Sequence, residues 1–171
     1  MQTAGKFVDD TVAALPDDPQ ALAELAGHAM YERDPASQAL AARLDAIAPG
    51  EASMSMTVRA DMLNGHATCH GGFIFALADS TFAFACNSRN QVTVASGCTI
   101  DFLAPAFEGD RLTAKAVEYS LAGRTGIYDV HVSNQDGKPI AVFRGRSYRI
   151  KGHVVEAPTG VDVNGVGPAS T

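Results

Sequence analysis

One short stretch combines the residue types needed to attack a carbonyl group. Residues 64–72 read Asn-Gly-His-Ala-Thr-Cys-His-Gly-Gly, and an apolar run containing a single acid, Asp79, follows directly. Two glycines at a helix start allow a ligand to approach backbone N–H groups without intrahelical acceptors, where the helix dipole also favours negative charge. The stretch therefore predicts an oxyanion site at Gly71 and Gly72. Asp79 is a carboxylate too costly to bury unless it is paired or used.

The same residues allow other interpretations. His66, Cys69, His70 and Asp79 include metal-ligating types, but three ligands crowded within five residues give poor geometry, so a helix-capping loop is favoured and no metal is expected. Asp79 also has a purely structural interpretation, in which backbone donors satisfy its carboxylate. Cys69 is expected to be a small core residue, since no base adjoins it.

A buried helix and a long antiparallel sheet would position this stretch. Apolar residues are nearly continuous from Gly72 to about Ser88, which predicts a helix buried on most sides. A period-two strand around residues 53–59 precedes it, after two short helices over 20–31 and 36–42. Four runs rich in β-branched and aromatic residues follow, over 92–102, 111–121, 125–134 and 139–150. This order predicts an α+β chain with a hotdog fold, an antiparallel sheet wrapped around a long central helix.

Composition and charge limit the function classes. The 171 residues suit one domain, expected over 21–153, between mobile ends at 1–20 and 156–171. A net charge of −6 argues against nucleic acid as the main partner, and no apolar run is long enough to span a membrane. The three cysteines follow no disulfide framework and the start lacks the pattern of a signal peptide, so a cytoplasmic location is expected.

Several segments in this order resemble the phenylacetic-acid-degradation thioesterases, a branch of the hotdog-fold acyl-CoA thioesterases. The resemblance extends from about residue 28 to 152. It rests on segments 62–66, 69–72, 77–79, 85–88, 98–102 and 143–145, which read Met-Leu-Asn-Gly-His, Cys-His-Gly-Gly, Leu-Ala-Asp, Ala-Cys-Asn-Ser, Cys-Thr-Ile-Asp-Phe and Phe-Arg-Gly. The resemblance implies an acyl-CoA thioester hydrolase acting on phenylacetyl-CoA or hydroxyphenylacetyl-CoA, with coenzyme A as part of the substrate and no separate cofactor.

The resemblance also implies roles for individual residues. Asn64 and His70 would shape the loop and hold the carbonyl or the water, and Gly71 would donate to the oxyanion. Asp79 would act as general base or nucleophile, an alternative that the sequence leaves open, with Ser80 beside it. Some relatives carry a serine where this chain has Ala95, which makes Ser96 a substitute candidate. Predicted substrate-binding and CoA-binding residues are Gly72, Phe102, Gly123, Arg124, Thr125, Arg144, Gly145 and Arg146.

The spacing of Gly71 and Asp79 has a consequence for assembly. A helix rises about 1.5 Å per residue, so the eight residues between them span roughly 12 Å, too far for both to reach one carbonyl. A second, antiparallel copy of the helix would bring its Asp79 to the first Gly71. An obligate homodimer with shared sites is therefore expected, and the resemblance implies a tetramer of two such dimers.

The basic residues of the last strand suit the phosphates of coenzyme A, although a solvated sheet edge explains them equally well. Two other function classes are open. A hotdog dehydratase would need a histidine base in a proline-rich loop, which the sequence lacks. A non-catalytic acyl-CoA-binding module would need an effector domain, and residues 1–27 are too short for one.

Overall fold

The computed structural model describes residues 14–157, and residues 1–13 and 158–171 lie outside it. The predicted mobile ends, 1–20 and 156–171, fall mostly on these outer residues. No helix in the described range has the length and apolarity needed to cross a membrane.

Two helices open the described chain, each capped by an aspartate before a proline. Helix α1 (Pro19–Glu32) begins after Asp18, whose side chain accepts a hydrogen bond from the Ala21 N–H, and α2 (Pro35–Ala39) begins after Asp34 in the same way. The carboxylate satisfies free N–H groups of the first turn, and proline at the first helical position needs no hydrogen-bond acceptor. Both helices confirm the predicted start signals, and α2 ends three residues earlier than expected.

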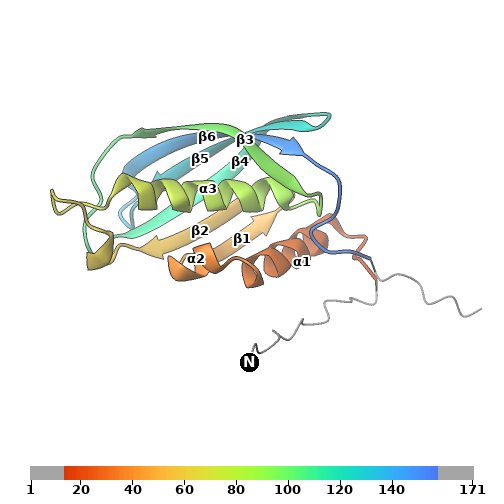
Figure 1. The fold of residues 1–171 in the computed structure, drawn as a ribbon, viewed down its shortest axis with the longest axis horizontal. Coiled ribbons are helices and arrows are strands. Elements are labelled where there is room, and N and C mark those ends of the chain that lie inside the picture. The colour runs from red at the N-terminus through yellow and green to blue at the C-terminus, as the bar shows by residue number, and fades with distance from the viewer. Residues whose placement is uncertain (1–13, 158–171) are drawn as a thin grey trace, which may run out of the picture.

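A six-stranded antiparallel sheet forms the body of the described chain (Figure 1). Its spatial order is β1-β2-β4-β5-β6-β3. The bounds are β1 (Arg43–Ala48), β2 (Glu51–Thr57), β3 (Thr93–Phe102), β4 (Arg111–Ala122), β5 (Thr125–Ser133) and β6 (Pro139–Arg149). The four runs predicted after the helix are β3 to β6. The sheet thus ends in β1 on one side and in β3 on the other.

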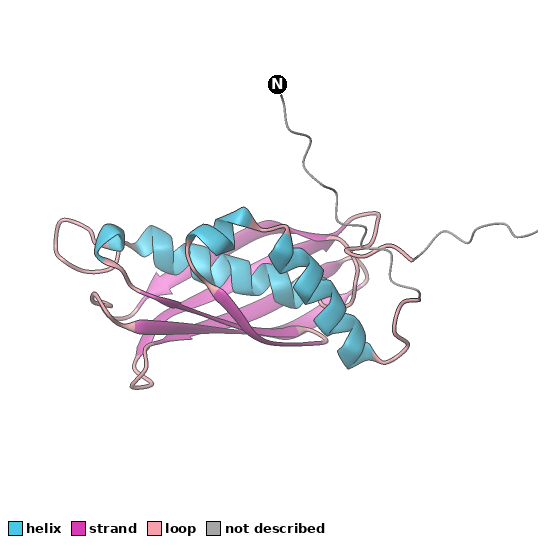
Figure 2. Cartoon of the chain, turned by 90° about the horizontal axis from the view of Figure 1, so that it is seen from below, coloured by secondary structure: helices cyan, strands magenta, loops and turns pink. Residues whose placement is uncertain are grey.

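Helix α3 (Gly71–Asn87) lies across one face of this sheet, as Figures 1 and 2 show. Three large inward side chains, Leu77, Phe82 and Phe84, are at most 1% exposed. They meet inward residues of the sheet such as Tyr128 and Phe143, whose ring centres lie 5.5 and 5.8 Å from that of Phe82. Helix and sheet therefore share one core, and the predicted hotdog fold is confirmed.

Strand β1 was missing from the sequence-based prediction. Residues 43–48 carry two charges and only one β-branched residue, Ile47, so their local preference for a strand is weak. The strand forms because β2 pairs with it through the tight turn at Gly50, which has φ of +82°. Tertiary pairing therefore decides this element, and α1 packs against both β1 and α3.

Candidate active site

The loop before α3 is closed by its own asparagine. The Asn64 Oδ1 atom accepts hydrogen bonds from the His66 N–H at 2.9 Å and the Thr68 N–H at 3.3 Å, and Nδ2 donates to Thr68 Oγ1 at 3.0 Å. A carboxamide nitrogen carries two protons, so one remains for a ligand. An isolated bridge between Leu63 and Cys69 joins the ends of the loop. Asn64 therefore holds the loop in shape, and one N–H of its Nδ2 is left to donate to a ligand.

His70 is the N-cap of α3. Its Nδ1 accepts a hydrogen bond from the Gly72 N–H at 3.0 Å, and its own N–H donates to the Met62 carbonyl at 2.8 Å. An Nδ1 that accepts carries no proton, so the neutral ring has its proton on Nε2. His70 thus shapes the helix start, as the sequence predicts, and presents an exposed Nε2–H.

Gly71 offers the free donor of this helix start. Its N–H has no acceptor among residues 14–157, whereas the N–H groups of Gly72 and Phe73 both donate to His70. A Cβ at position 71 would lie 2.9 Å from Cζ of Phe102, a residue 53% exposed. Phe102 therefore packs directly over Gly71, and the structure brings these two predicted site residues together.

Asp79 is half-buried on α3, two turns beyond Gly71. Its carboxylate forms no hydrogen bond or ion pair with any residue the structure describes, and burial raises its pKa above the usual value. The purely structural interpretation of Asp79 required backbone donors, and no described backbone N–H donates to it. The group is instead a poorly solvated carboxylate of raised basicity. Such groups occur preferentially at functional sites.

Ser80 points toward α2 rather than toward the loop. Its hydroxyl lies 3.1 Å from that of Ser37, a fully buried side chain whose Oγ donates to Asp34 Oδ2 at 2.5 Å. No pattern in the sequence indicates this contact, because it joins residues 43 positions apart. Ser96 is exposed and donates to the Arg146 carbonyl at 3.1 Å. The catalytic roles of both serines stay predictions.

The predicted binding residues of β6 have distinct surroundings. Arg144 donates two hydrogen bonds to Asp129, at 2.6 and 2.7 Å, and its guanidinium lies 5.3 Å from the ring centre of Tyr119. Gly145 faces the core instead, where a Cβ would lie 2.8 Å from the ring of Phe82. Arg146 is exposed on the opposite face. Gly145 is therefore required for close packing of α3 on the sheet.

The turn between β4 and β5 holds the remaining predicted binding residues. Gly123 adopts φ of +60°, a left-handed conformation that favours glycine, and Thr125 begins β5. The guanidinium of Arg124 stands 5.5 Å from the ring centre of Tyr148. This hairpin lies beyond the C-terminal end of α3, while Gly72 lies at its start. The predicted binding residues thus divide between the two ends of the helix.

A cavity of about 510 Å³ opens beside the helix start. Its lining includes His70 and Gly72 from the predicted site. The rest of the lining carries no motif that the sequence could have revealed: Ala36, Ala39 and Leu40 of the α2 segment, Arg59, and Phe73 and Ala76 of α3. No group of three His, Cys, Asp or Glu side chains in the described range is placed to hold a metal.

Comparisons with known proteins show the family to which the chain belongs. Residues 66–141 match the family model of the thioesterase superfamily. The chain is 51% identical over 127 residues to the acyl-coenzyme A thioesterase PaaI of Escherichia coli, covering 74% of this chain and 91% of that protein. The chain therefore belongs to the thioesterase superfamily, and within it the predicted enzyme class, an acyl-CoA thioesterase, is confirmed.

Two solved structures are similar to this chain over most of its described length. The PaaI protein from the phenylacetic acid degradation operon of E. coli has a TM-score of 0.78 at 48% identity, covering 80% of this chain and 99% of that chain. A variant of the phenylacetic acid degradation protein PaaI from Thermus thermophilus has a TM-score of 0.66 at 45% identity, covering 68% and 100%.

Proposed function

We propose that the chain hydrolyses phenylacetyl-CoA or a hydroxyphenylacetyl-CoA to the free acid and coenzyme A, using Gly71 and Asp79. The observation that carries the proposal is that α3 combines two groups without partners among the described residues: the Gly71 N–H at its start and the half-buried Asp79 carboxylate. The similarity to PaaI proteins of phenylacetic acid degradation supports the choice of acyl group.

Each residue then has a defined task. The Gly71 N–H stabilises the oxyanion that forms when the thioester carbonyl is attacked, which is usually the largest catalytic contribution. In the base-catalysed route, Asp79 takes a proton from water as the water oxygen bonds to the carbonyl carbon. Collapse of the oxyanion breaks the C–S bond, and the coenzyme A thiolate takes the proton from Asp79. Coenzyme A is thus part of the substrate, and no separate cofactor is required.

The second route open to Asp79 is direct attack, which forms an acyl-enzyme anhydride. The two routes differ in kinetics, since an acyl-enzyme that accumulates releases a burst of thiol equal to the sites present. Rapid mixing of enzyme with phenylacetyl-CoA in the presence of a thiol reagent distinguishes them.

We also propose that the working enzyme is a homodimer in which each site takes Gly71 from one subunit and Asp79 from the other. Gly72, Ala76, Asp79 and Ala83 repeat at intervals of four, three and four residues, so they share one face of α3. All four are at least partly exposed, and their small size allows a second helix to approach closely. This face suits an antiparallel copy of α3.

The edge of the sheet supports the same dimer. Strand β3 is ten residues long and lies at the edge, and most of its residues are partly or fully exposed. A long uncovered edge strand invites pairing with another chain. Pairing of two β3 strands would cover both edges while bringing the two copies of α3 together. Exposed Val117, Tyr119 and Tyr148 on the outer sheet suit a further contact between dimers, as a tetramer requires.

The proposed activity is tested by thiol release from a panel of aryl and aliphatic acyl-CoAs. We expect the highest kcat/KM with phenylacetyl-CoA or its hydroxylated forms. Asp79→Asn keeps the size of the side chain and removes the base, so kcat is expected to fall by about 10²- to 10⁴-fold. Wild-type rates in this variant would exclude Asp79 from the chemistry, and a preference for long aliphatic acyl groups would exclude the proposed substrate. Since the substrate is a coenzyme A ester, we place the reaction in the cytoplasm.

A further inference from the structure

A second cavity lies at the other end of α3, beyond the C-terminal end of the helix. Its volume is about 30 Å³, and its lining includes Cys86, Arg89, Gln91, Arg124, Ser147 and Arg149. It shares no lining residue with the cavity beside His70. A water-sized group needs roughly 10–15 Å³ of such space, so this cavity has room for about two.

Ser147 supplies a buried donor inside this cavity. The residue is 1% exposed, and its hydroxyl has no hydrogen-bond partner among the residues that the structure describes. It lies on the inward face of β6, in register with Gly126 of β5, where a Cβ would lie 2.6 Å from the Ser147 Oγ. Most buried hydroxyl groups are hydrogen-bonded, so an unpaired one that lines a cavity indicates a ligand.

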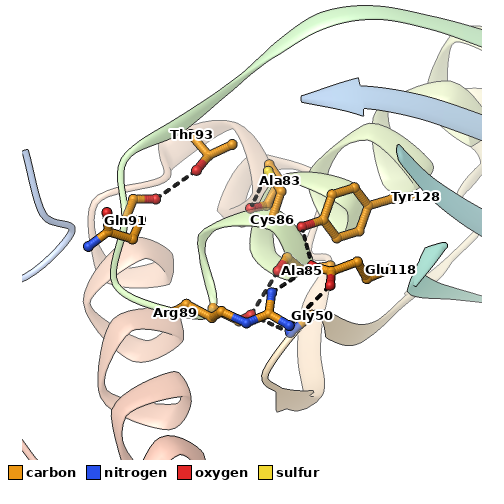
Figure 3. Close-up of polar contacts among 10 residues, drawn as sticks. Gly50, Ala83, Ala85, Cys86, Arg89, Gln91, Thr93, Glu118 and Tyr128 are labelled. Atoms are coloured by element: carbon orange, nitrogen blue, oxygen red, sulfur yellow. Dashed lines mark hydrogen bonds and ion pairs between the residues drawn. The ribbon is translucent and has the colours of Figure 1, made fainter. Parts of the chain in front are cut away.

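The charges around the cavity do not balance. Glu118 accepts two hydrogen bonds from Arg89, at 2.6 and 3.2 Å, and one from the Tyr128 hydroxyl at 2.7 Å, and Figure 3 shows it between the two. The negative charge of Glu118 is therefore balanced by the positive charge of Arg89. Arg124 and Arg149 form no ion pair with any carboxylate in residues 14–157. The guanidinium of Arg124 lies against the ring of Tyr148, whose side chain leaves the opposite face of the sheet from Ser147, so the positive charge that remains at the cavity is that of Arg149.

The hairpin holds these two arginines next to each other. The Arg149 N–H donates to the Arg124 carbonyl at 2.8 Å, which fixes the end of β6 against the β4–β5 turn. Ser147 and Arg149 are two residues apart on one strand, so their side chains leave the same face of the sheet. The backbone thus presents the Ser147 hydroxyl and the Arg149 side chain to one space.

Neighbouring titratable groups add no negative charge. Burial raises the pKa of the Cys86 thiol to about 12, and burial with the Glu118 hydrogen bond also raises that of the Tyr128 hydroxyl. Both stay neutral at physiological pH. The Gln91 side chain contributes an amide that donates and accepts equally well.

We propose that this cavity binds a phosphate-class oxyanion, with two of its oxygens held by the Ser147 hydroxyl and the Arg149 guanidinium. Guanidinium groups bind phosphate oxygens through paired, charge-assisted hydrogen bonds. The phosphate group is either inorganic phosphate or one carried by coenzyme A. The proposal concerns binding alone, so it does not depend on thioester hydrolysis.

Isothermal titration of the full chain with inorganic phosphate at constant ionic strength tests the site. Arg149→Gln and Ser147→Ala are each expected to weaken phosphate binding, the first by at least about tenfold because it removes a charged donor. Lys115→Gln is the matched control, since it also removes one positive charge. Lys115 is exposed on β4 and does not line the cavity. Circular dichroism melting curves verify that each variant is folded.

Two further ligands identify the source of the phosphate group. If coenzyme A competes with inorganic phosphate and dephospho-coenzyme A does not, the site is assigned to the 3′-phosphate of the substrate. Failure of both to compete would assign it to the free ion, and both results support the site. Absence of phosphate binding by the wild-type chain, or equal losses in Lys115→Gln and Arg149→Gln, would overturn the proposal.

Discussion

Replacing Gly71 with proline deletes the proposed oxyanion donor and little else. Proline is well tolerated at the first helical position, and it requires an extended conformation in the residue before it. His70 already has φ of −63° and ψ of 131°. The lost N–H has no acceptor in the described structure, so its removal breaks no hydrogen bond of the fold. Loss of one oxyanion donor is expected to lower kcat by roughly 10²- to 10³-fold, equivalent to about 3–4 kcal/mol.

Gly71→Ala separates the donor from the shape of the site. Both substitutions place a Cβ 2.9 Å from Cζ of Phe102, whose exposed ring can move aside. Only proline removes the N–H. Thiol release from phenylacetyl-CoA is therefore expected to be far slower in Gly71→Pro than in Gly71→Ala. Equal losses in the two variants would mean that crowding against Phe102, not the missing donor, lowers the rate.

The same variant tests whether sites are shared between subunits. Co-expression of Gly71→Pro and Asp79→Asn chains in equal amounts gives hybrid dimers in about half of the population by random pairing. A hybrid with shared sites contains one site with both residues intact and one with neither. Activity of the mixture is then expected to reach about a quarter of that of the wild type. Activity no higher than that of the two separate variants would place each complete site within one chain and refute the helix-rise argument.

Four further predictions concern the pH profile, stability and assembly. Burial raises the pKa of Asp79, so the acid limb of kcat/KM lies at higher pH than that of an ordinary aspartate, and Asp79→Asn removes this limb from any residual rate. Because the folded-state pKa of Asp79 lies above the unfolded-state value, the protonated carboxyl favours folding at low pH, and this contribution is lost as pH rises through the folded-state pKa. Asp79→Asn is therefore expected to raise the free energy of unfolding, measured in urea, more at pH 7 than at pH 3. Equal gains at both pH values would contradict the burial of this carboxylate. Tyr128→Phe removes the 2.7 Å hydrogen bond to Glu118 and is expected to lower the free energy of unfolding by about 1–3 kcal/mol, while Tyr128→Leu, which also loses ring packing, falls further. Ala76→Glu places a charge on the outer face of α3, and light scattering is expected to show monomers without thioesterase activity, whereas an active dimer would exclude this face as the interface.

The sequence predicted the central helix and five of the six strands, β2 to β6, because their signals are local. Helix α3 begins and ends within one residue of the predicted bounds, since its apolar run is nearly continuous and its start carries a cap. Strand β1 was missed because pairing with β2, not its own composition, makes it a strand. Local preference therefore located the elements that form the site, and tertiary contacts decided the rest.

The candidate site divides in the same way. Gly71 and Asp79 were identifiable because a free N–H and an isolated acid are properties of sequence position. The surroundings of Gly145 and Ser80 depend on Phe82 and Ser37, which approach from other elements, and no spacing along the chain records such contacts. Residue type thus indicates chemistry, while the assignment of a glycine to packing or to binding needs the fold.

The closed loop that Asn64 forms has a thermodynamic consequence for catalysis. Hydrogen bonds to Asn64, Met62 and Ala106 fix residues 64–70 without help from a ligand. The conformational entropy of this segment is therefore lost once, when the chain folds, and not at each turnover. The binding free energy of the substrate is then available to orient the thioester against Gly71. In an Asn64→Ala chain, part of that free energy would instead be spent on ordering the loop each time a substrate binds.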